Sequence, residues 1–195
     1  VVAITSGTPA VMGFTEDKRK EAGRQFIDVG IAEEHAVSFA AGLALGGVIP
    51  VVAIYSSFLQ RAVDQMLHDV CMQKLHVIFA VDRAGLVGAD GETHQGNFDI
   101  SYLSMMPGMT VMAPKNDWEL KEMLRFAVKA DGPVAIRYPR GNAYQGLQEY
   151  QTAVEMGKSE VLHSGCKVAV LALGSMVEIC ADVCSELQKA GIDPT

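Results

Sequence analysis

Short, continuous apolar runs, separated by longer stretches of helical period, constrain this chain more than any other feature of its sequence. The runs Val51–Ile54 and Val77–Val81 contain no polar residue. Strands that are buried on both faces have this composition, and they occur in mostly parallel sheets that are covered by helices. The sequence therefore predicts an α/β fold, with a doubly wound, mostly parallel sheet and helices on both faces.

The alternation of the two patterns predicts the order of the elements. Strands are expected at residues 1–5, 25–29, 48–54, 76–81, 109–113, 134–138 and 168–173. Helices are expected at residues 32–45, 57–72, 116–130 and 175–190. Helix 57–72 carries an i,i+4 apolar stripe, whereas helix 32–45 is apolar almost all round, which is typical of a buried helix.

Composition divides the chain into three parts. Residues 1–145 are expected to form one α/β domain, 146–166 a more polar linker, and 167–195 the start of a second, truncated α/β domain. The chain opens on an apolar run without Met and stops shortly after a helical stretch. These features lead us to expect a piece of a longer protein.

Charge and composition argue against several classes of function. The net charge of -7 gives no reason to expect nucleic acid or an anionic membrane as a partner. No apolar run approaches membrane-spanning length, and no signal peptide is visible. Because the four cysteines form no C-x-x-C pair, we expect reduced thiols, no metal site and a cytoplasmic location, or a plastid in a plant or alga.

The residues that follow the strands are the candidates for a site, because ligands bind at the carboxyl ends of strands in open α/β sheets. Glu33 follows strand 25–29 and lies at the start of the apolar helix. A helix N-terminus favours the charge of such a carboxylate while burial opposes it, so the group can exchange a proton with a ring nitrogen. From spacing alone, an ordinary helix-start carboxylate is the commoner explanation.

The segment 82–99 is long and rich in glycine for a connection inside a compact domain, and such loops are usually functional. In it, Asp90 is suited to orienting a hydroxyl and His94 to acid or base chemistry near neutral pH. A solvated loop with a turn-forming Asp and a surface His explains the same residues equally well. The glycine spacing matches neither the dinucleotide fingerprint nor the P-loop.

Arginines and aromatic rings follow the other strands on the same edge. Arg83 and Arg140 together suit a phosphate group, although ordinary surface arginines are commoner. Tyr55 and Phe58 are suited to stacking on a planar ring, although core packing is the commoner role for such a Phe.

Four segments together resemble the transketolase-like thiamine-diphosphate enzymes. They are Phe26–Ala36, Ala53–Ala62, Asp82–Gly91 and Arg137–Gly141. The third segment resembles those members that condense pyruvate with glyceraldehyde 3-phosphate, releasing CO2, to give 1-deoxy-D-xylulose 5-phosphate. Transketolase and the beta subunits of 2-oxo acid dehydrogenases share the I-x-E pattern at Ile31–Glu33 but lack the third segment.

The resemblance implies a role for the residues that would meet the cofactor. Glu33 would exchange a proton with the aminopyrimidine ring of thiamine diphosphate and so activate the cofactor for attack on pyruvate. Tyr55 and Phe58 would line the aminopyrimidine pocket, and Arg61 would support it.

The resemblance also implies roles on the substrate side. Arg83 and Arg140 would hold the phosphate of glyceraldehyde 3-phosphate. Asp90 and His94 would approach the reacting carbons.

One part of the family's pattern is missing from this chain. The diphosphate and Mg2+ site of the family uses a G-D-G motif in a separate N-terminal domain, and the nearest strings here are Ala89–Gly91 and Ala130–Gly132. The resemblance therefore implies Mg2+ binding by a domain outside this chain, a homodimer, and a fragment that is inactive alone. Transketolase, a dehydrogenase beta subunit and a non-catalytic standalone domain remain open as alternatives.

Overall fold

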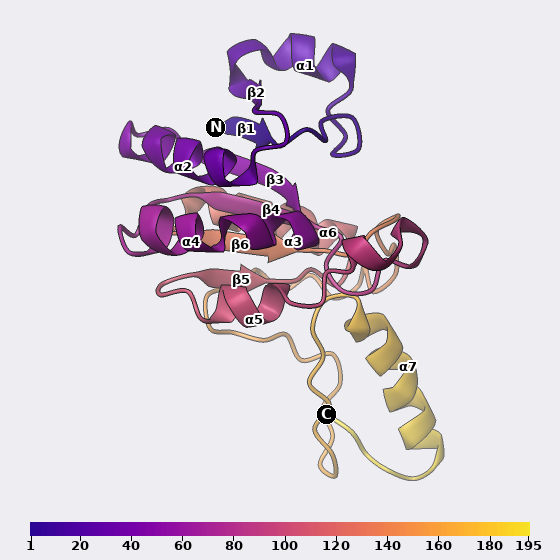
Figure 1. Cartoon of the computed structure of the whole chain (residues 1–195). Coiled ribbons are helices and arrows are strands. Elements are labelled where there is room, and N and C mark those ends of the chain that lie inside the picture. The colour runs from indigo at the N-terminus through magenta and orange to yellow at the C-terminus, as the bar shows by residue number, and fades with distance from the viewer. The chain divides into compact units, whose positions relative to one another are not determined.

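Six parallel strands form one sheet, which confirms the predicted fold class (Figure 1). The computed structural model describes residues 1–195. The strand order is β2-β1-β3-β4-β6-β5. The strands are β1 (Val2–Thr5), β2 (Phe26–Asp28), β3 (Pro50–Tyr55), β4 (Ile78–Asp82), β5 (Thr110–Met112) and β6 (Val134–Arg137).

The order of the strands creates a topological switch point at the carboxyl edge of the sheet. The chain passes from β1 to β2 on one side, and then returns to β3 on the other side of β1. The loops after β1 and β3 therefore leave in opposite directions, which is the arrangement that creates a ligand crevice in open α/β sheets. The register pairs Thr5 with Ala53 and Tyr55 with Asp82, so these strand ends lie at the same edge.

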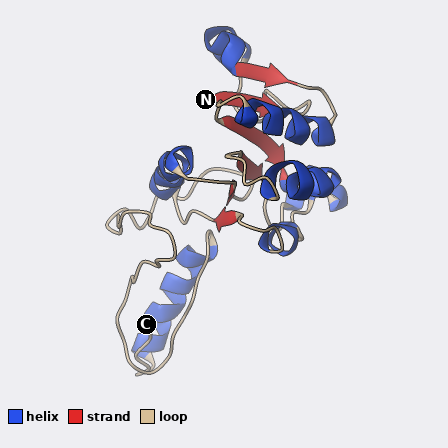
Figure 2. Cartoon of the chain, turned by 90° about the vertical axis from the view of Figure 1, so that its left-hand side faces the viewer, coloured by secondary structure: helices blue, strands red, loops and turns tan.

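One face of the sheet is packed against α2 (Glu33–Leu45), the helical segment 56–71 and α5 (Asp99–Ser104), which lie along one side of the strands (Figure 2). Small residues of α2, such as Ala36 and Ala40, allow close approach to the strands. The largest fully buried side chains of this core include Ile4, Ile54, Leu59, Met66, Phe79 and Leu103.

The helix predicted at 57–72 is not regular, and that prediction was wrong in its detail. The segment consists of α3 (Ser56–Leu59), a 3-10 turn (Gln60–Ala62), α4 (Val63–Gln65) and a π-helical turn (Met66–Cys71). An apolar stripe determines which side of a helix faces the core, but it does not determine the hydrogen-bond pattern of the backbone. Such 3-10 and π interruptions often mark functional sites.

Two short helices were not predicted from the sequence. They are α1 (Glu16–Ala22), which buries no residue and so shows no apolar stripe, and α5, which is only six residues long. The helices predicted at 116–130 and 175–190 are present as α6 (Asp117–Lys129) and α7 (Met176–Lys189).

The chain divides into two compact units. One unit contains Val1–Met112 and Ala127–Arg140, and the other contains Ala113–Phe126 and Gly141–Thr195. The strand predicted at 168–173 is absent from the second unit, where Val168 forms only an isolated bridge with Pro194. A strand needs a neighbouring strand for its backbone hydrogen bonds, and within this unit only the short segment 193–195 pairs with it.

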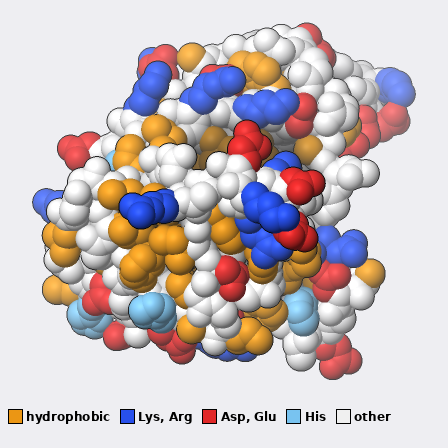
Figure 3. Space-filling view, turned by 90° about the horizontal axis from the view of Figure 1, so that it is seen from above, with side chains coloured by type: hydrophobic (Ala, Val, Ile, Leu, Met, Phe, Trp, Pro, Cys, Tyr) orange, Lys and Arg blue, Asp and Glu red, His pale blue; other side chains and the backbone are white.

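No helix of the structure combines the length and the apolar character needed to cross a membrane. The face drawn in Figure 3 mixes Lys and Arg with Asp and Glu side chains around exposed apolar ones.

Candidate active site

Glu33 is the first residue of α2, and its side chain is 2% exposed. Its partner is Arg61, whose Nη1 donates to Oε1 at 2.6 Å. A buried carboxylate is costly unless a cation or hydrogen-bond donors accompany it, and here both the arginine and the helix N-terminus do so. Arg61 lies in the 3-10 turn that interrupts segment 56–71, so the irregular backbone supplies the partner of Glu33. Glu33 is therefore held in a fixed orientation with one oxygen engaged by Arg61.

Three rings form an aromatic cluster beside this pair, defined here as Tyr55, Phe58 and His94. The Tyr55 and Phe58 rings stack with centroids 5.1 Å apart. His94 meets them edge-on, at 6.2 Å from Tyr55 and 5.2 Å from Phe58. Stacked and edge-to-face pairs are favoured arrangements of aromatic rings, so the three side chains hold one another in place.

Two arginines lie against the aromatic cluster. The guanidinium carbon of Arg61 is 5.3 Å from the Phe58 centroid, and that of Arg83 is 3.9 Å from the Tyr55 centroid. Cation–π contacts at these distances hold both side chains over the rings. The pair Glu33–Arg61 and the arginine Arg83 thus lie on the same aromatic cluster.

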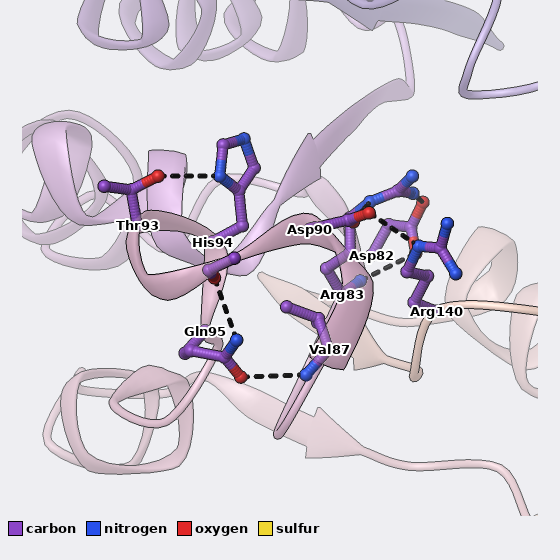
Figure 4. Close-up of polar contacts among 9 residues, drawn as sticks. Asp82, Arg83, Val87, Asp90, Thr93, His94, Gln95 and Arg140 are labelled. Carbon is purple, nitrogen blue, oxygen red and sulfur yellow. Dashed lines mark hydrogen bonds and ion pairs between the residues drawn. The ribbon is translucent and has the colours of Figure 1, made fainter.

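Asp90 joins the two arginines that were predicted to bind phosphate (Figure 4). Arg83 Nε lies 3.0 Å from Oδ2 of Asp90, and Arg140 Nε lies 2.8 Å from Oδ1. Arg83 also pairs with Asp82. Burial opposes the charge of Asp90, but the hydrogen bond from Arg83 and the nearby charges of Arg140 and Arg83 outweigh it and lower the pKa of Asp90. Asp90 is therefore a carboxylate near neutral pH and fixes the two guanidinium groups side by side.

The segment 82–99 is an ordered loop. It contains 3-10 turns at Gly88–Asp90 and Glu92–His94, which present Asp90 and His94. Gln95 braces it from inside: its Oε1 accepts from the Val87 N–H and its Nε2 donates to the Gly91 carbonyl, both at 2.9 Å. In Figure 4, Gln95 and Val87 are joined below His94 and Asp90.

Sequence reasoning missed three residues that hold this loop: Asp82, Gln95 and Gly96. Asp82 pairs with Arg83, Gln95 provides the internal brace, and Gly96 closes the base of the loop by exchanging two 2.8 Å hydrogen bonds with Gly85. No pattern in the sequence signals the Gln95 contacts, because they depend on the path of the folded loop.

No group of three or more His, Cys, Asp or Glu side chains is arranged to hold a metal ion. The four cysteines are free thiols. Burial raises the pKa of the Cys71 thiol to about 11, so this thiol is protonated and inert.

The eight predicted site residues are therefore brought together at the carboxyl edge of the sheet. The structure links them in two connected groups, Glu33–Arg61 with the aromatic cluster and Arg83–Asp90–Arg140.

Residues 3–145 match the family described as transketolase, pyrimidine binding domain. The chain belongs to this family, which confirms the class indicated by the sequence. Among curated proteins, it is 56% identical over 195 residues to the 1-deoxy-D-xylulose-5-phosphate synthase of Lachnoclostridium phytofermentans, and 54% identical over 197 residues to that of Natranaerobius thermophilus. Both alignments include 100% of this chain but only 31% of the relative.

Transketolases are among the solved structures that share this fold. One described as a split gene transketolase, inactive beta4 tetramer, has a TM-score of 0.86 and 27% identity, covering 99% of this chain and 62% of that chain. The transketolase of Campylobacter jejuni has a TM-score of 0.83 over 99% of this chain and 31% of its own, at 21% identity, which shows a shared fold.

Proposed function

We propose that this chain is the pyrimidine-binding portion of a thiamine-diphosphate-dependent 1-deoxy-D-xylulose-5-phosphate synthase. The whole enzyme would condense pyruvate with glyceraldehyde 3-phosphate and release CO2. The observation that carries the proposal is the buried Glu33 carboxylate, whose partner Arg61 lies on Phe58 of the aromatic cluster, while the Arg83–Asp90–Arg140 group contacts Tyr55 of the same cluster through Arg83.

The residues fit the aminopyrimidine end of the cofactor. Glu33 is a buried carboxylate with only Oε1 engaged by Arg61, and Arg61 in turn lies against the Phe58 ring that stacks on Tyr55. When bound, thiamine diphosphate supplies the nucleophilic carbon and the electron sink that decarboxylation of a 2-oxo acid requires. Glu33 would hold and exchange a proton at a ring nitrogen, because a carboxylate in a fixed, desolvated position is suited to that transfer.

The residues of this chain do not fit the metal end of the cofactor. Mg2+ prefers carboxylate and carbonyl oxygens in octahedral geometry, and the acidic side chains here are not grouped in that way. We propose that the ligands of Mg2+ and of the diphosphate belong to another part of a longer protein. The relatives, of which this chain spans 31%, have the length for it.

On the substrate side, Arg83 and Arg140 would bind the phosphate of the aldehyde. Two guanidinium groups held side by side suit the oxygens of a phosphate monoester. Asp90 would keep them in register and accept from a substrate hydroxyl. His94, whose Nδ1 lies 2.9 Å from the Thr93 hydroxyl, would exchange a proton at the oxygen of the reacting carbonyl.

Transketolase activity is the main competing proposal. The identity to the synthases is 50–56% among the first relatives, against 27% to the split gene transketolase, which favours the synthase. A homodimer and a cytoplasmic location remain predictions.

An assay of the full-length protein separates the alternatives. We expect CO2 release and 1-deoxy-D-xylulose 5-phosphate from pyruvate and glyceraldehyde 3-phosphate, and little transfer from a ketose phosphate donor to an aldose phosphate. Transfer from the ketose phosphate without use of pyruvate would identify a transketolase. No turnover of either pair would favour a non-catalytic domain.

A further inference from the structure

Gly96 lies where no other residue fits, and the reason is space. A Cβ at this position would fall far inside contact distance of the Arg83 carbonyl oxygen, and 2.8 Å and 2.9 Å from the Oγ and Cβ of Ser56. Any side chain at position 96 therefore forces Arg83 or Ser56 to move.

Ser56 has little freedom to move. It is 0% exposed, and its carbonyl accepts a hydrogen bond from the Tyr102 hydroxyl at 2.9 Å. It also directly follows Tyr55 of the aromatic cluster. A side chain at position 96 would therefore act mainly on Arg83.

The backbone of Arg83 is in an unusual conformation. Its φ is +58°, in the left-handed region that non-glycine residues rarely adopt, at a cost of about 1 kcal/mol or more. Neighbouring contacts hold it there: the Ala84 N–H donates to the Tyr138 carbonyl at 3.0 Å, and Gly85 exchanges two 2.8 Å hydrogen bonds with Gly96. If the Arg83 peptide is displaced, these contacts no longer favour the left-handed conformation, and the direction of the guanidinium group changes.

We propose that Gly96, backed by Ser56, is a positioning residue that sets the direction of Arg83 and so determines the preference for a phosphorylated aldehyde. Ser56, Gly96 and Arg83 are defined here as the loop neck. The inference rests on the proposed function for the identity of the substrate. The loop neck connects Tyr55 of the aromatic cluster, through Ser56 and Gly96, to Arg83. A substitution at position 96, which does not touch the substrate, therefore alters phosphate binding.

The test uses the full-length protein loaded with cofactor and the variant Gly96→Ala. Calorimetry measures the binding of glycerol 3-phosphate, a phosphate ester that cannot react. Turnover is measured with glyceraldehyde 3-phosphate and with unphosphorylated glyceraldehyde. We expect Gly96→Ala to weaken glycerol 3-phosphate binding at least tenfold and to raise the KM for the phosphorylated aldehyde to a similar degree. The kcat with either aldehyde, and the KM for unphosphorylated glyceraldehyde, should change by less than about twofold.

Two further variants make the result interpretable. Ser56→Thr adds a methyl group to the loop neck from the other side and should give the same pattern with a smaller effect. Ala89→Ser adds one heavy atom at an exposed position of the same loop and should leave all values unchanged. If Gly96→Ala does not fold, the same measurements on Ser56→Thr test the positioning role of Gly96. If both lose their cooperative unfolding transition, the loop neck serves the fold and the proposal is wrong.

The outcomes also separate this inference from the proposed function. If wild type turns over both substrates but Gly96→Ala binds glycerol 3-phosphate normally, the positioning role is wrong and the proposed function stands. If wild type shows no turnover but binds glycerol 3-phosphate, and Gly96→Ala loses that binding, the positioning role stands and the proposed function is wrong. Failure of wild type to bind glycerol 3-phosphate, or an equal rise in KM for both aldehydes, contradicts the inference.

Discussion

At the scale of single residues, the sequence predicts the burial of Glu33 but not its pairing with Arg61. The composition of α2 predicts a buried helix. Glu33 is indeed 2% exposed, whereas Glu34 and His35, which follow it, are exposed. The pairing of Glu33 with Arg61 was not predictable, because it depends on the 3-10 turn at Gln60–Ala62, where Ala62 departs from helical geometry with φ -107° and ψ 19°. The residue types were visible in the sequence, but the contact between them was not.

Removal of Arg61 tests this pair. Arg61→Ala leaves a buried carboxylate without its cation, and breaking such a pair is strongly destabilising. Because the Arg61 side chain is half exposed, we expect a smaller loss, about 1–3 kcal/mol in the free energy of unfolding by urea. The double variant Glu33→Gln/Arg61→Ala should recover most of this loss. Additive effects of the two substitutions would show that the pair contributes nothing.

The lowered pKa of Asp90 predicts how the stability of the protein depends on pH. Its pKa in the folded state lies below the ordinary value of 3.8, so its contribution to stability is present above that value and is lost as the pH falls through the folded pKa. Asp90→Asn should therefore melt at a lower temperature than wild type at pH 7. The difference in melting temperature should shrink as the pH falls below 3.8. A difference that stays constant down to acidic pH would exclude the Arg83–Asp90–Arg140 group as its source.

At the scale of elements, the loop 82–99 was recognised by its length and glycine content, whereas its internal support was not. The backbone contacts of Gln95 and Gly96 join residues that only the folded loop brings together. The same limitation applies to the segment 168–173, which has the composition of a strand but only a short partner segment with which to pair. Local composition predicts what a segment can form, and its neighbours determine what it does form.

Gln95→Ala tests the internal brace of the loop. The substitution leaves the Val87 N–H without its acceptor, and Val87 is 6% exposed. An unsatisfied buried donor costs about 1–3 kcal/mol, so amide exchange at Val87 should accelerate roughly tenfold to a hundredfold. Amides of β4 in the same protein serve as the control and should exchange at the wild-type rate. Unchanged exchange at Val87 would mean that Gln95 does not support the loop.

At the scale of the whole molecule, the proposed function needs more than this chain contains. The chain brings together a carboxylate, an aromatic cluster and a pair of arginines held by Asp90, but no set of metal ligands. The chain spans 31% of its curated relatives. The proposed function therefore requires a further segment that supplies the ligands of the metal and the diphosphate.

The isolated chain tests that requirement. Because the diphosphate and Mg2+ contribute much of the binding free energy of such a cofactor and meet no ligand set here, we expect no micromolar binding of thiamine diphosphate by calorimetry. Heat of binding in the micromolar range, with Mg2+ and without any added segment, would show that the chain alone forms the site.

The role proposed for Glu33 is tested by the turnover of pyruvate and glyceraldehyde 3-phosphate by the full-length protein with Glu33→Gln. Glutamine keeps the size of the side chain and removes the proton exchange, so we expect a loss of kcat of about a hundredfold or more. The unfolding transition should be retained, and Ala89→Ser should keep wild-type turnover. Near-normal turnover by Glu33→Gln would show that Glu33 does not exchange the proton that activates the cofactor.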